Sequence, residues 1–187
     1  LLFQNMDFTD AYEGFQVLYK INFSDKSLFV YGFVGQFGGI GVNSRGLGVT
    51  INVIVNVASN TGKGIPSTAV TRMLLEQDSV EDCAGLMERI PISTGGSYTV
   101  ADPKTAVCFE ASANKIVRID PTDRQYIIRT NHAVRTDDLI DVPGEFNGME
   151  PVYDEKGRSV VLTCERYALA ERMVKFMYAE LGVEEAI

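Results

Sequence analysis

Apolar and polar positions divide the chain into a β-rich first part, a helical middle, a second group of strands and a last helix. Alternating, aromatic and β-branched residues predict strands over 15–23 ("FQVLYKINF") and 27–35 ("SLFVYGFVG"). The opening residues 1–3 ("LLF") predict a buried strand. The polar group 43–46 ("NSRG") separates two apolar runs and predicts a hairpin turn. Residues 56–64, rich in Asn, Gly and Ser, predict a loop.

Three helices are predicted from their start and stop signals. Pro66 opens the first, because proline is tolerated at the start of a helix. The capping box Ser79–Asp82 starts a second helix that runs to about Glu88. A third is predicted over 162–181 and stops at Gly182. The apolar stripe of this last helix consists of Leu169, Ala170, Met173, Phe176 and Met177.

Short strands separated by tight turns fill the region between the second and third helices. They are "SYTVAD", "TAVCFEAS", "KIVRID" and "QYIIRTN". Their connections are too short for parallel crossovers, so an antiparallel meander is expected. Residues 133–158 are polar and predict a long surface loop. Strands and helices in separate groups predict a single α+β domain over residues 1–187, with helices layered on an antiparallel sheet.

Composition excludes several classes of function. The chain has 187 residues, enough for one sizeable core, and a formal net charge of −8. This acidity gives no basic excess to bind nucleic acid. No apolar run approaches the roughly 20 residues of a membrane-spanning helix. The single histidine, His132, rules out a multi-histidine metal site, and three widely spaced cysteines do not suggest a zinc site or a disulfide framework.

Four polar positions interrupt apolar surroundings and are the candidate site. Asn5 and Asp7 end the opening stretch, Asn52 lies inside "GVTINVIV", and Asn131 precedes His132. The fourth is Arg166, which the helical repeat places toward the core face, with Asp7 as its expected carboxylate partner. Asparagine amides that donate to an oxyanion, with an aspartate and an arginine that orient a nucleophile's amine, would suit amide chemistry.

Each position also has a structural interpretation. An Asn or Asp at a strand end commonly caps its own backbone, and Asn52 would satisfy a bulge. Arg166 would be a surface residue, and a lone histidine is more often structural than catalytic. The set also lacks a nucleophile. Cys83 and Cys108 read as packing residues, and Cys164, although in the first turn of a helix, has no histidine at visible spacing.

The chain as a whole resembles the acyl-coenzyme A:isopenicillin N acyltransferase-like family of cysteine N-terminal nucleophile (Ntn) hydrolases, to which the bile-salt hydrolases are related. The resemblance covers residues 1 to about 132, more loosely "TCERYALAERMV", and rests on order and spacing. The matching stretches are "QNMDF", "GIGVNSRGLGVTINVI", "GIPSTAVTRMLLE", "SVEDCAGLMERIPISTGGSYTVAD", "CFEAS" and "RTNH".

The resemblance implies a four-layer αββα sandwich and a precursor cleaved just before a cysteine. That cysteine attacks an amide with its thiol, while its own α-amine, with a pKa near ~7.7–8.0, serves as base. Asp7 matches the aspartate that holds the nucleophile, and Asn52 matches a substrate or oxyanion contact, a role also expected for Asn5. Asn131 resembles an oxyanion-hole donor, and Arg166 the arginine that opens a later helix. Gly46 and Leu47 would shape the hairpin.

The nucleophile has no counterpart in the chain, and neither do the family's further C-terminal strands, which would follow Ile187. The sandwich is therefore expected to be incomplete at both ends, with the cysteine upstream of Leu1. The expected activity of the parent protein is hydrolysis of a linear amide, with the chain alone inactive. An acyl-CoA-dependent N-acyltransferase and a non-catalytic binding domain remain as alternatives.

No cofactor is expected, with acyl-CoA as a substrate in the acyltransferase alternative, and the single histidine disfavours a metal enzyme. The expected partner is a small-molecule amide, not nucleic acid or a membrane, and a homo-oligomer remains open. A cytoplasmic location is favoured, although an upstream signal remains open.

Overall fold

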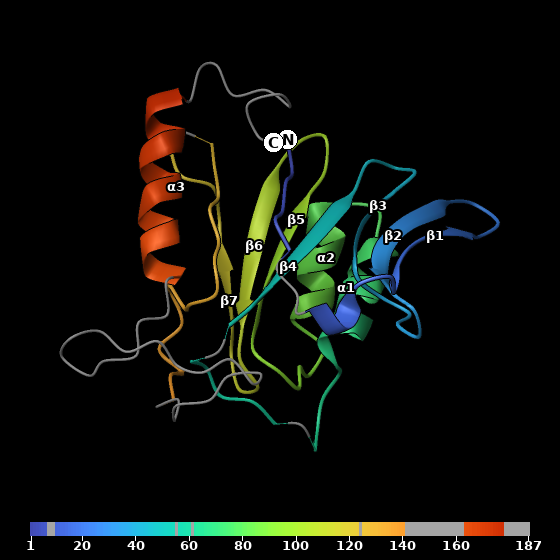
Figure 1. Cartoon of the computed structure of the whole chain (residues 1–187), viewed down its shortest axis with the longest axis horizontal. Helices are drawn as coiled ribbons and strands as arrows, with labels where there is room; N and C mark the ends of the chain where they lie inside the picture. The colour runs from blue at the N-terminus through green and yellow to red at the C-terminus, as the bar shows by residue number, and fades with distance from the viewer. Residues whose placement is uncertain (7–9, 55, 61, 124, 141–162, 178–187) are drawn as a thin grey trace.

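The computed structural model describes residues 1–6, 10–54, 56–60, 62–123, 125–140 and 163–177. Within them, seven strands form one antiparallel sheet in which each strand pairs with its neighbours in sequence (Figure 1). The strands are β1 (Gln16–Asn22), β2 (Ser27–Phe33), β3 (Ile40–Asn43), β4 (Gly48–Val53), β5 (Gly96–Ala101), β6 (Ala106–Ala111) and β7 (Ile116–Ile119). The helices are α1 (Ser67–Leu75), α2 (Val80–Met87) and α3 (Thr163–Met177), with a 3₁₀ turn, η1 (Asp10–Tyr12).

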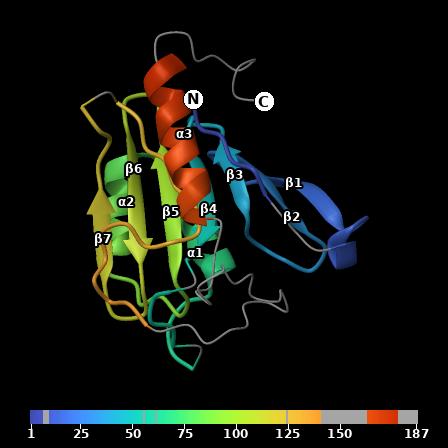
Figure 2. The same ribbon diagram turned by 60° about the vertical axis from the view of Figure 1, so that its left-hand side comes forward.

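Helices lie on both sides of the sheet (Figures 1 and 2). The chain leaves β4, forms α1 and α2 against one face, and returns as β5. On the other side, residues 125–136, here called the crossing segment, run between β5–β6 and α3. The α+β prediction is therefore confirmed, with strands and helices in separate layers.

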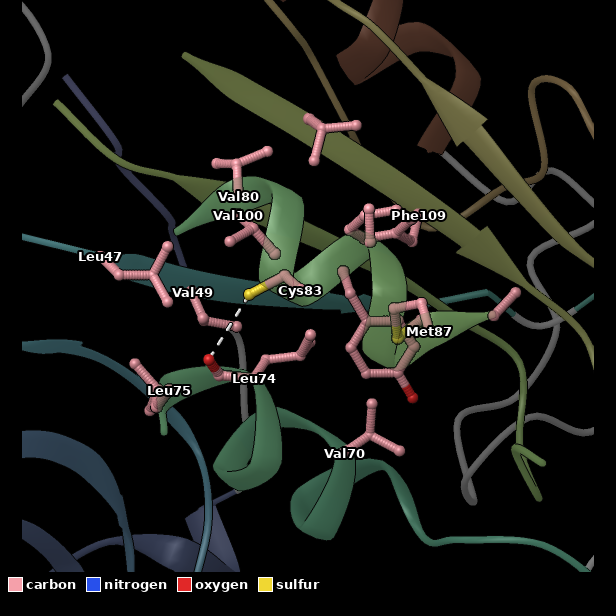
Figure 3. Close-up of a cluster of buried hydrophobic side chains, with 14 of the residues drawn as sticks. Leu47, Val49, Val70, Leu74, Leu75, Val80, Cys83, Met87, Val100 and Phe109 are labelled. Carbon is pink, nitrogen blue, oxygen red and sulfur yellow. Dashed lines mark hydrogen bonds between the residues drawn. The ribbon is translucent and has the colours of Figure 1, made fainter. Parts of the chain in front are cut away.

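The hydrophobic core fills the space between the sheet and helices α1 and α2 (Figure 3). Every second residue of the central strands points into it, as the two-residue strand period requires. The helices contribute residues three or four apart, such as Val70 and Leu74 or Cys83 and Met87, so each buries one stripe. From the strands come Leu28, Val30, Val49, Tyr98, Val100, Val107 and Phe109.

The predicted hairpin at residues 43–46 joins β3 to β4. Gly46 has a φ of +87°, which a side chain would disfavour, and its N–H donates to Asn43 O at 3.0 Å. The buried Asn43 side chain accepts from the N–H groups of Arg45 and Leu47. It also donates to the carbonyls of Leu75 and Gln77 at 3.0 and 2.8 Å, which ties the hairpin to the end of α1.

Most predicted elements are confirmed. The first two strands, the loop after residue 56, and the three short strands after residue 96 lie where expected. Ser79 caps α2, its Oγ accepting from Asp82 N at 3.2 Å. Pro66 occupies the position just before α1. The last helix runs from Thr163 to Met177, and residues 178–187 lie outside the described residues.

Two strand predictions are wrong. Residues 1–3 form no strand, and Leu1 and Phe3 are 83% and 50% exposed. "QYIIRTN" is also outside the sheet, because it crosses the face of β5 and β6, where side chains such as Arg129 hold it and no β-ladder forms.

The stripe on α3 is not buried among the described residues: Leu169, Met173 and Phe176 are 47%, 51% and 90% exposed. Most of the predicted 133–158 loop lies outside the described residues.

Candidate active site

Strands β4, β5 and β6 have one apolar face and one polar face, and the polar face forms the floor of the candidate site. Residues directly opposite each other on neighbouring strands point to the same face. Asn52 on β4 is opposite Ser97 on β5, which is opposite Glu110 on β6. The next row of this face is Thr50, Thr99 and Cys108. The rows between them, such as Ile51, Tyr98 and Phe109, point to α1 and α2.

A buried ion pair stands on this polar floor. Arg129 of the crossing segment bonds the Glu110 carboxylate, and their side chains are 4% and 0% exposed. Arg129 Nε also donates to Ser97 Oγ at 2.7 Å. Because both charges are removed from water, each requires the other and further hydrogen bonds.

The Glu110 carboxylate accepts three backbone hydrogen bonds in addition. The N–H groups of Val134, Arg135 and Thr136 donate to it at 2.8, 2.8 and 2.6 Å. Burial alone would raise the pKa of Glu110, but these donors together with Arg129 outweigh it and lower the pKa. Glu110 is therefore ionised, and it anchors the crossing segment to β6.

Asn131 is carried by the crossing segment and held on three sides. Its backbone N–H donates to Thr163 Oγ1 at 2.6 Å. Its side-chain Nδ2 donates to Val53 O at 3.1 Å, and its Oδ1 accepts from Arg166 Nη2 at 2.8 Å. Arg166 and Val53 O together fix which way the amide points, and among the described residues the second N–H of Nδ2 has no acceptor.

The edge of β4 is where the N-terminal segment and the crossing segment meet. β3 pairs with β4 only at Gly48 and Val49. Beyond that, Gln4 Oε1 accepts from Ile51 N at 3.0 Å and Gln4 Nε2 donates to Ile51 O at 2.5 Å. Alternate residues of a strand direct their main-chain groups to the same edge. Val53 O therefore lies on the same edge of β4 as the Ile51 groups that bond Gln4, and it accepts the hydrogen bond from Asn131 Nδ2.

This arrangement brings together three of the five predicted site residues. Asn52, half-buried, lies on β4 between the residues that Gln4 and Asn131 bond, and Arg166 contacts Asn131 directly. Asn5 follows Gln4 at this edge and is exposed. Asp7 lies outside the described residues.

The prediction that Arg166 is buried on the core face is wrong. Its side chain is exposed, and its partner is the Asn131 carbonyl oxygen. The residue of α3 that is buried is Thr163, 2% exposed, because the start of the helix rests on the crossing segment through that side chain. The pairing of Arg166 with Asp7 stays a prediction.

His132 serves the packing between the crossing segment and α3. Its Nδ1 lies 3.1 Å from Thr130 Oγ1 and 3.2 Å from Thr163 Oγ1, and its ring meets Tyr167 edge to face. Burial, then the positive charge of Arg129, lowers the pKa of His132. The imidazole is therefore neutral at neutral pH.

The sequence patterns did not identify Gln4, Ser97, Glu110, Arg129 and Thr163. Glu110 and Arg129 each interrupt an apolar run, "AVCFEA" and "YIIRT", so the criterion that selected Asn52 would have found both. Nothing in the sequence distinguishes Ser97 or Thr163 from other hydroxyl residues, because their partners come from distant segments.

The three cysteines differ in their surroundings. Cys83 packs in the core with its Sγ 3.5 Å from Leu74 O, and burial, then Asp82, raises its pKa to about 12 (Figure 3). Cys108 is buried 2.9 Å from Ser97 Oγ, and burial raises its pKa. Neither thiol is poised as a thiolate. Cys164 is exposed at the start of α3.

The described residues contain no group of three or more His, Cys, Asp and Glu side chains placed to hold a metal ion. No helix in this part of the chain has the length and apolar character needed to span a membrane.

An open groove of about 520 Å³ adjoins the site on the side of β1–β3. Its lining includes Gln4 and Thr50 near the site and Leu18, Phe29 and Val42 on β1–β3. These three apolar side chains are 68%, 38% and 44% exposed. The sheet face thus changes from polar to apolar where β4 meets β3.

Comparison with known proteins decides the family. The model of the family described as acyl-coenzyme A:6-aminopenicillanic acid acyl-transferase matches residues 1–141. The chain belongs to this acyl-transferase family. The matched range includes Asn5, Asn52 and Asn131, while Arg166 lies beyond it. A comparison with curated protein sequences finds no match.

Solved structures show the same fold. Two variants of conjugated bile acid hydrolase from Clostridium perfringens align with TM-scores of 0.56 and 0.55, at 16% and 18% identity. The alignments cover 93% and 85% of this chain and 70% and 60% of those chains. Penicillin V acylase from Agrobacterium tumefaciens aligns over 58% of this chain with a TM-score of 0.46 and 19% identity. The chain spans 36% of that protein's length. The fold of this member of the acyl-transferase family is that of the Ntn hydrolases.

Proposed function

We propose that the protein containing this chain is an amidohydrolase that cleaves a linear carbon–nitrogen amide bond through a thioester on an N-terminal cysteine upstream of residue 1. The observation that carries the proposal is the Asn131 amide, held at the edge of β4 beside Asn52 with Arg166 on its carbonyl oxygen. Family membership and the fold agree with it. The chain alone, without that cysteine, would be inactive.

The chemistry assigns a role to each residue. The cysteine thiol attacks the amide carbonyl carbon, and the cysteine's own α-amine takes the thiol proton and passes it to the leaving amine. The carbonyl oxygen becomes an oxyanion in the tetrahedral intermediate, and the unused N–H of Asn131 Nδ2 donates to it. Water then attacks the thioester, which releases the acid and regenerates the thiol.

The remaining residues complete the site. Arg166, bonded to Asn131 Oδ1, polarises the amide and keeps Nδ2 toward β4. Asn52 and Asn5 contact the substrate or share the oxyanion. Asp7 holds the α-amine of the nucleophile. No cofactor takes part in this scheme.

The alternative is an N-acyltransferase that uses acyl-CoA as acyl donor. The family description names an acyl-coenzyme A substrate, which favours it. Both reactions form the same kind of thioester and differ in whether water or an amine accepts the acyl group. Hydrolysis is preferred because transfer also needs a built acceptor pocket. A non-catalytic binding domain is disfavoured by the contact of Asn131 with Arg166 and with the backbone beside Asn52.

The test is made on the full-length gene product. Mass spectrometry of the purified protein is expected to show a mature chain that begins with cysteine upstream of Leu1. A panel of N-acyl amides should be hydrolysed, with an acyl adduct on that cysteine after rapid quenching. Added amines that capture the acyl group in preference to water would favour the acyltransferase. A protein without an upstream cysteine, or without turnover of either kind, would refute the proposal.

A further inference from the structure

The crossing segment is positioned without the support of a β-ladder. Among the described residues it belongs to no strand, yet it carries Asn131. A donor must be held within about 0.5 Å of its productive place to stabilise a transition state. Some other feature of the fold must therefore supply this rigidity.

One carboxylate closes the segment into an arc around Asn131. Glu110 Oε2 accepts from Arg129 and from Val134 N, and Oε1 accepts from the backbone N–H groups of Arg135 and Thr136. The first anchor lies two residues before Asn131 and the second begins three residues after it. The same side chain thus holds both ends of the arc.

The anchor itself is rigid. Glu110 is fully buried on β6, between β5 and β7 in the sheet. Arg129 makes a second side-chain hydrogen bond, to Ser97 Oγ on β5, the strand beside β6.

The four hydrogen-bond donors around Glu110 also explain why a carboxylate occupies this position. Each of its two oxygens receives two donors, and a carboxylate is the side chain with acceptor capacity on both atoms. A glutamine of the same shape would turn an NH₂ group toward two of these four donors.

We propose that Glu110 is a positioning residue for catalysis, which sets the Asn131 amide by closing the arc from Arg129 to Thr136. This inference rests on the proposed function. Glu110 acts through Asn131 and contacts no reacting atom. Since Asn131 is assigned to the oxyanion, loss of the arc weakens binding of the transition state more than binding of the substrate.

The first measurement is a double-mutant cycle in the full-length enzyme. Glu110→Gln is expected to lower kcat by roughly tenfold or more with little change in KM. In an Asn131→Ala background the same substitution should change kcat little, because the residue through which it acts is gone. Equal effects of Glu110→Gln in both backgrounds would overturn the inference.

The matched control is Phe109→Leu, the neighbouring residue on β6, whose side chain faces α1 and α2. It perturbs the same strand from the opposite face. Its kcat should stay near that of the wild type even where its unfolding midpoint drops as far as that of Glu110→Gln. A comparable loss of kcat in both variants would reduce Glu110 to a structural role and refute positioning.

A second readout does not depend on amide turnover. Amide hydrogen exchange should be at least roughly tenfold faster at Val134, Arg135 and Thr136 in Glu110→Gln, and unchanged there in Phe109→Leu. Unchanged protection in Glu110→Gln would overturn the arc even in an active enzyme. If the wild type hydrolyses no amide but Glu110→Gln shows the faster exchange, the proposed function and the catalytic role of Glu110 are both refuted. Only the structural role of Glu110 in holding residues 129–136 would then stand.

Discussion

At the scale of single residues, Asn131 combines two requirements of a transition-state donor. Its carbonyl oxygen is occupied by Arg166 and one N–H by Val53 O, so the amide has little freedom to rotate. Its side chain is nevertheless only half-buried, which leaves room for a substrate. A purely structural asparagine such as Asn43 instead has both its oxygen and its nitrogen committed to backbone groups inside the protein.

Removal of the Asn131 amide tests this role. In the full-length enzyme, Asn131→Ala is expected to lower kcat by roughly 10²–10³ while KM changes little, because an oxyanion donor acts in the transition state. Steady-state kinetics on the best amide of the panel measure it. The control is Asn114→Ala, which should retain full activity. Asn114 is an exposed asparagine whose side chain bonds Asp138. A kcat for Asn131→Ala close to that of the wild type would remove the residue from the oxyanion role.

A second residue-scale prediction concerns Tyr98 in the core. Its side chain is fully buried, and its hydroxyl has no hydrogen-bond partner among the described residues. Burial also raises the pKa of this phenol. Tyr98→Phe removes an unsatisfied polar group and should raise the free energy of unfolding by up to about 1 kcal/mol.

Tyr19 provides the matched comparison, because its hydroxyl donates to Phe33 O at 3.1 Å. Tyr19→Phe should cost about 0.5–1.5 kcal/mol. Urea denaturation of the full-length protein measures both variants. A loss of stability in Tyr98→Phe similar to that in Tyr19→Phe would show that the hydroxyl is satisfied.

At the scale of elements, α3 is docked through its first turn. Thr163 O and Oγ1 bond Thr130 and Asn131, and His132 and Tyr167 pack beside them. Further along the helix, Leu169, Met173 and Phe176 are exposed, so the contact that positions Arg166 depends on a few residues. Those residues include the titratable His132.

This docking predicts a pH dependence of stability. The pKa of His132 is lowered in the folded state, by burial first and then by Arg129, with Arg166 adding and Glu110 opposing. The unfolded state therefore binds the proton first as pH falls below the ordinary value of 6.5. Stability contributed by neutral His132 is present above pH 6.5 and is lost as pH falls toward the lower pKa of the folded state.

Substitution of the histidine isolates this contribution. Between pH 7 and about pH 5, the wild type should lose stability, because His132 takes up a proton more readily in the unfolded state. Ordinary carboxylates, with pKa values of about 4, titrate little in that range and add little to the loss. His132→Gln should show a flatter profile over the same range. Urea midpoints across that range measure both proteins. Parallel profiles would show that His132 does not govern this dependence.

At the scale of the whole molecule, the described residues leave two apolar surfaces uncovered. One is the groove face of β1–β3 with Leu18, Phe29 and Val42, and the other is the stripe of α3. Uncovered apolar patches of this kind favour association, as do open strand edges.

A polypeptide limited to residues 1–187 is therefore expected to self-associate and to bind a hydrophobic dye, and the full-length protein to do so less. Light scattering coupled to size-exclusion chromatography and ANS fluorescence compare the two. Leu18→Lys, at the most exposed of the groove positions, should reduce association of the short polypeptide, whereas Lys63→Ala, far from both surfaces in sequence, should not. A monodisperse monomer that binds no dye would contradict the expectation.

Sequence patterns by themselves determined most of the local structure and the class of the fold. The strands from β1 to β7, the hairpin at Gly46 and the Ser79 cap follow from side-chain period, backbone freedom and short-range hydrogen bonds, which the neighbouring residues decide. Asn52, Asn131 and Arg166 were found because each interrupts an apolar run. Order and spacing of motifs also gave the family.

Only the tertiary structure decided how these residues are held. The crossing segment has the apolar run of a strand, but its course over β5 and β6 depends on Arg129, Ser97 and Glu110, which lie 13 to 32 positions apart in the sequence. Likewise, the partner of Arg166 proved to be Asn131, and Gln4 proved to pair with the edge of β4. Such contacts depend on which segments the fold brings together, and no local pattern records them, because an amide or carboxylate bonds whatever donor the packing places within about 3 Å.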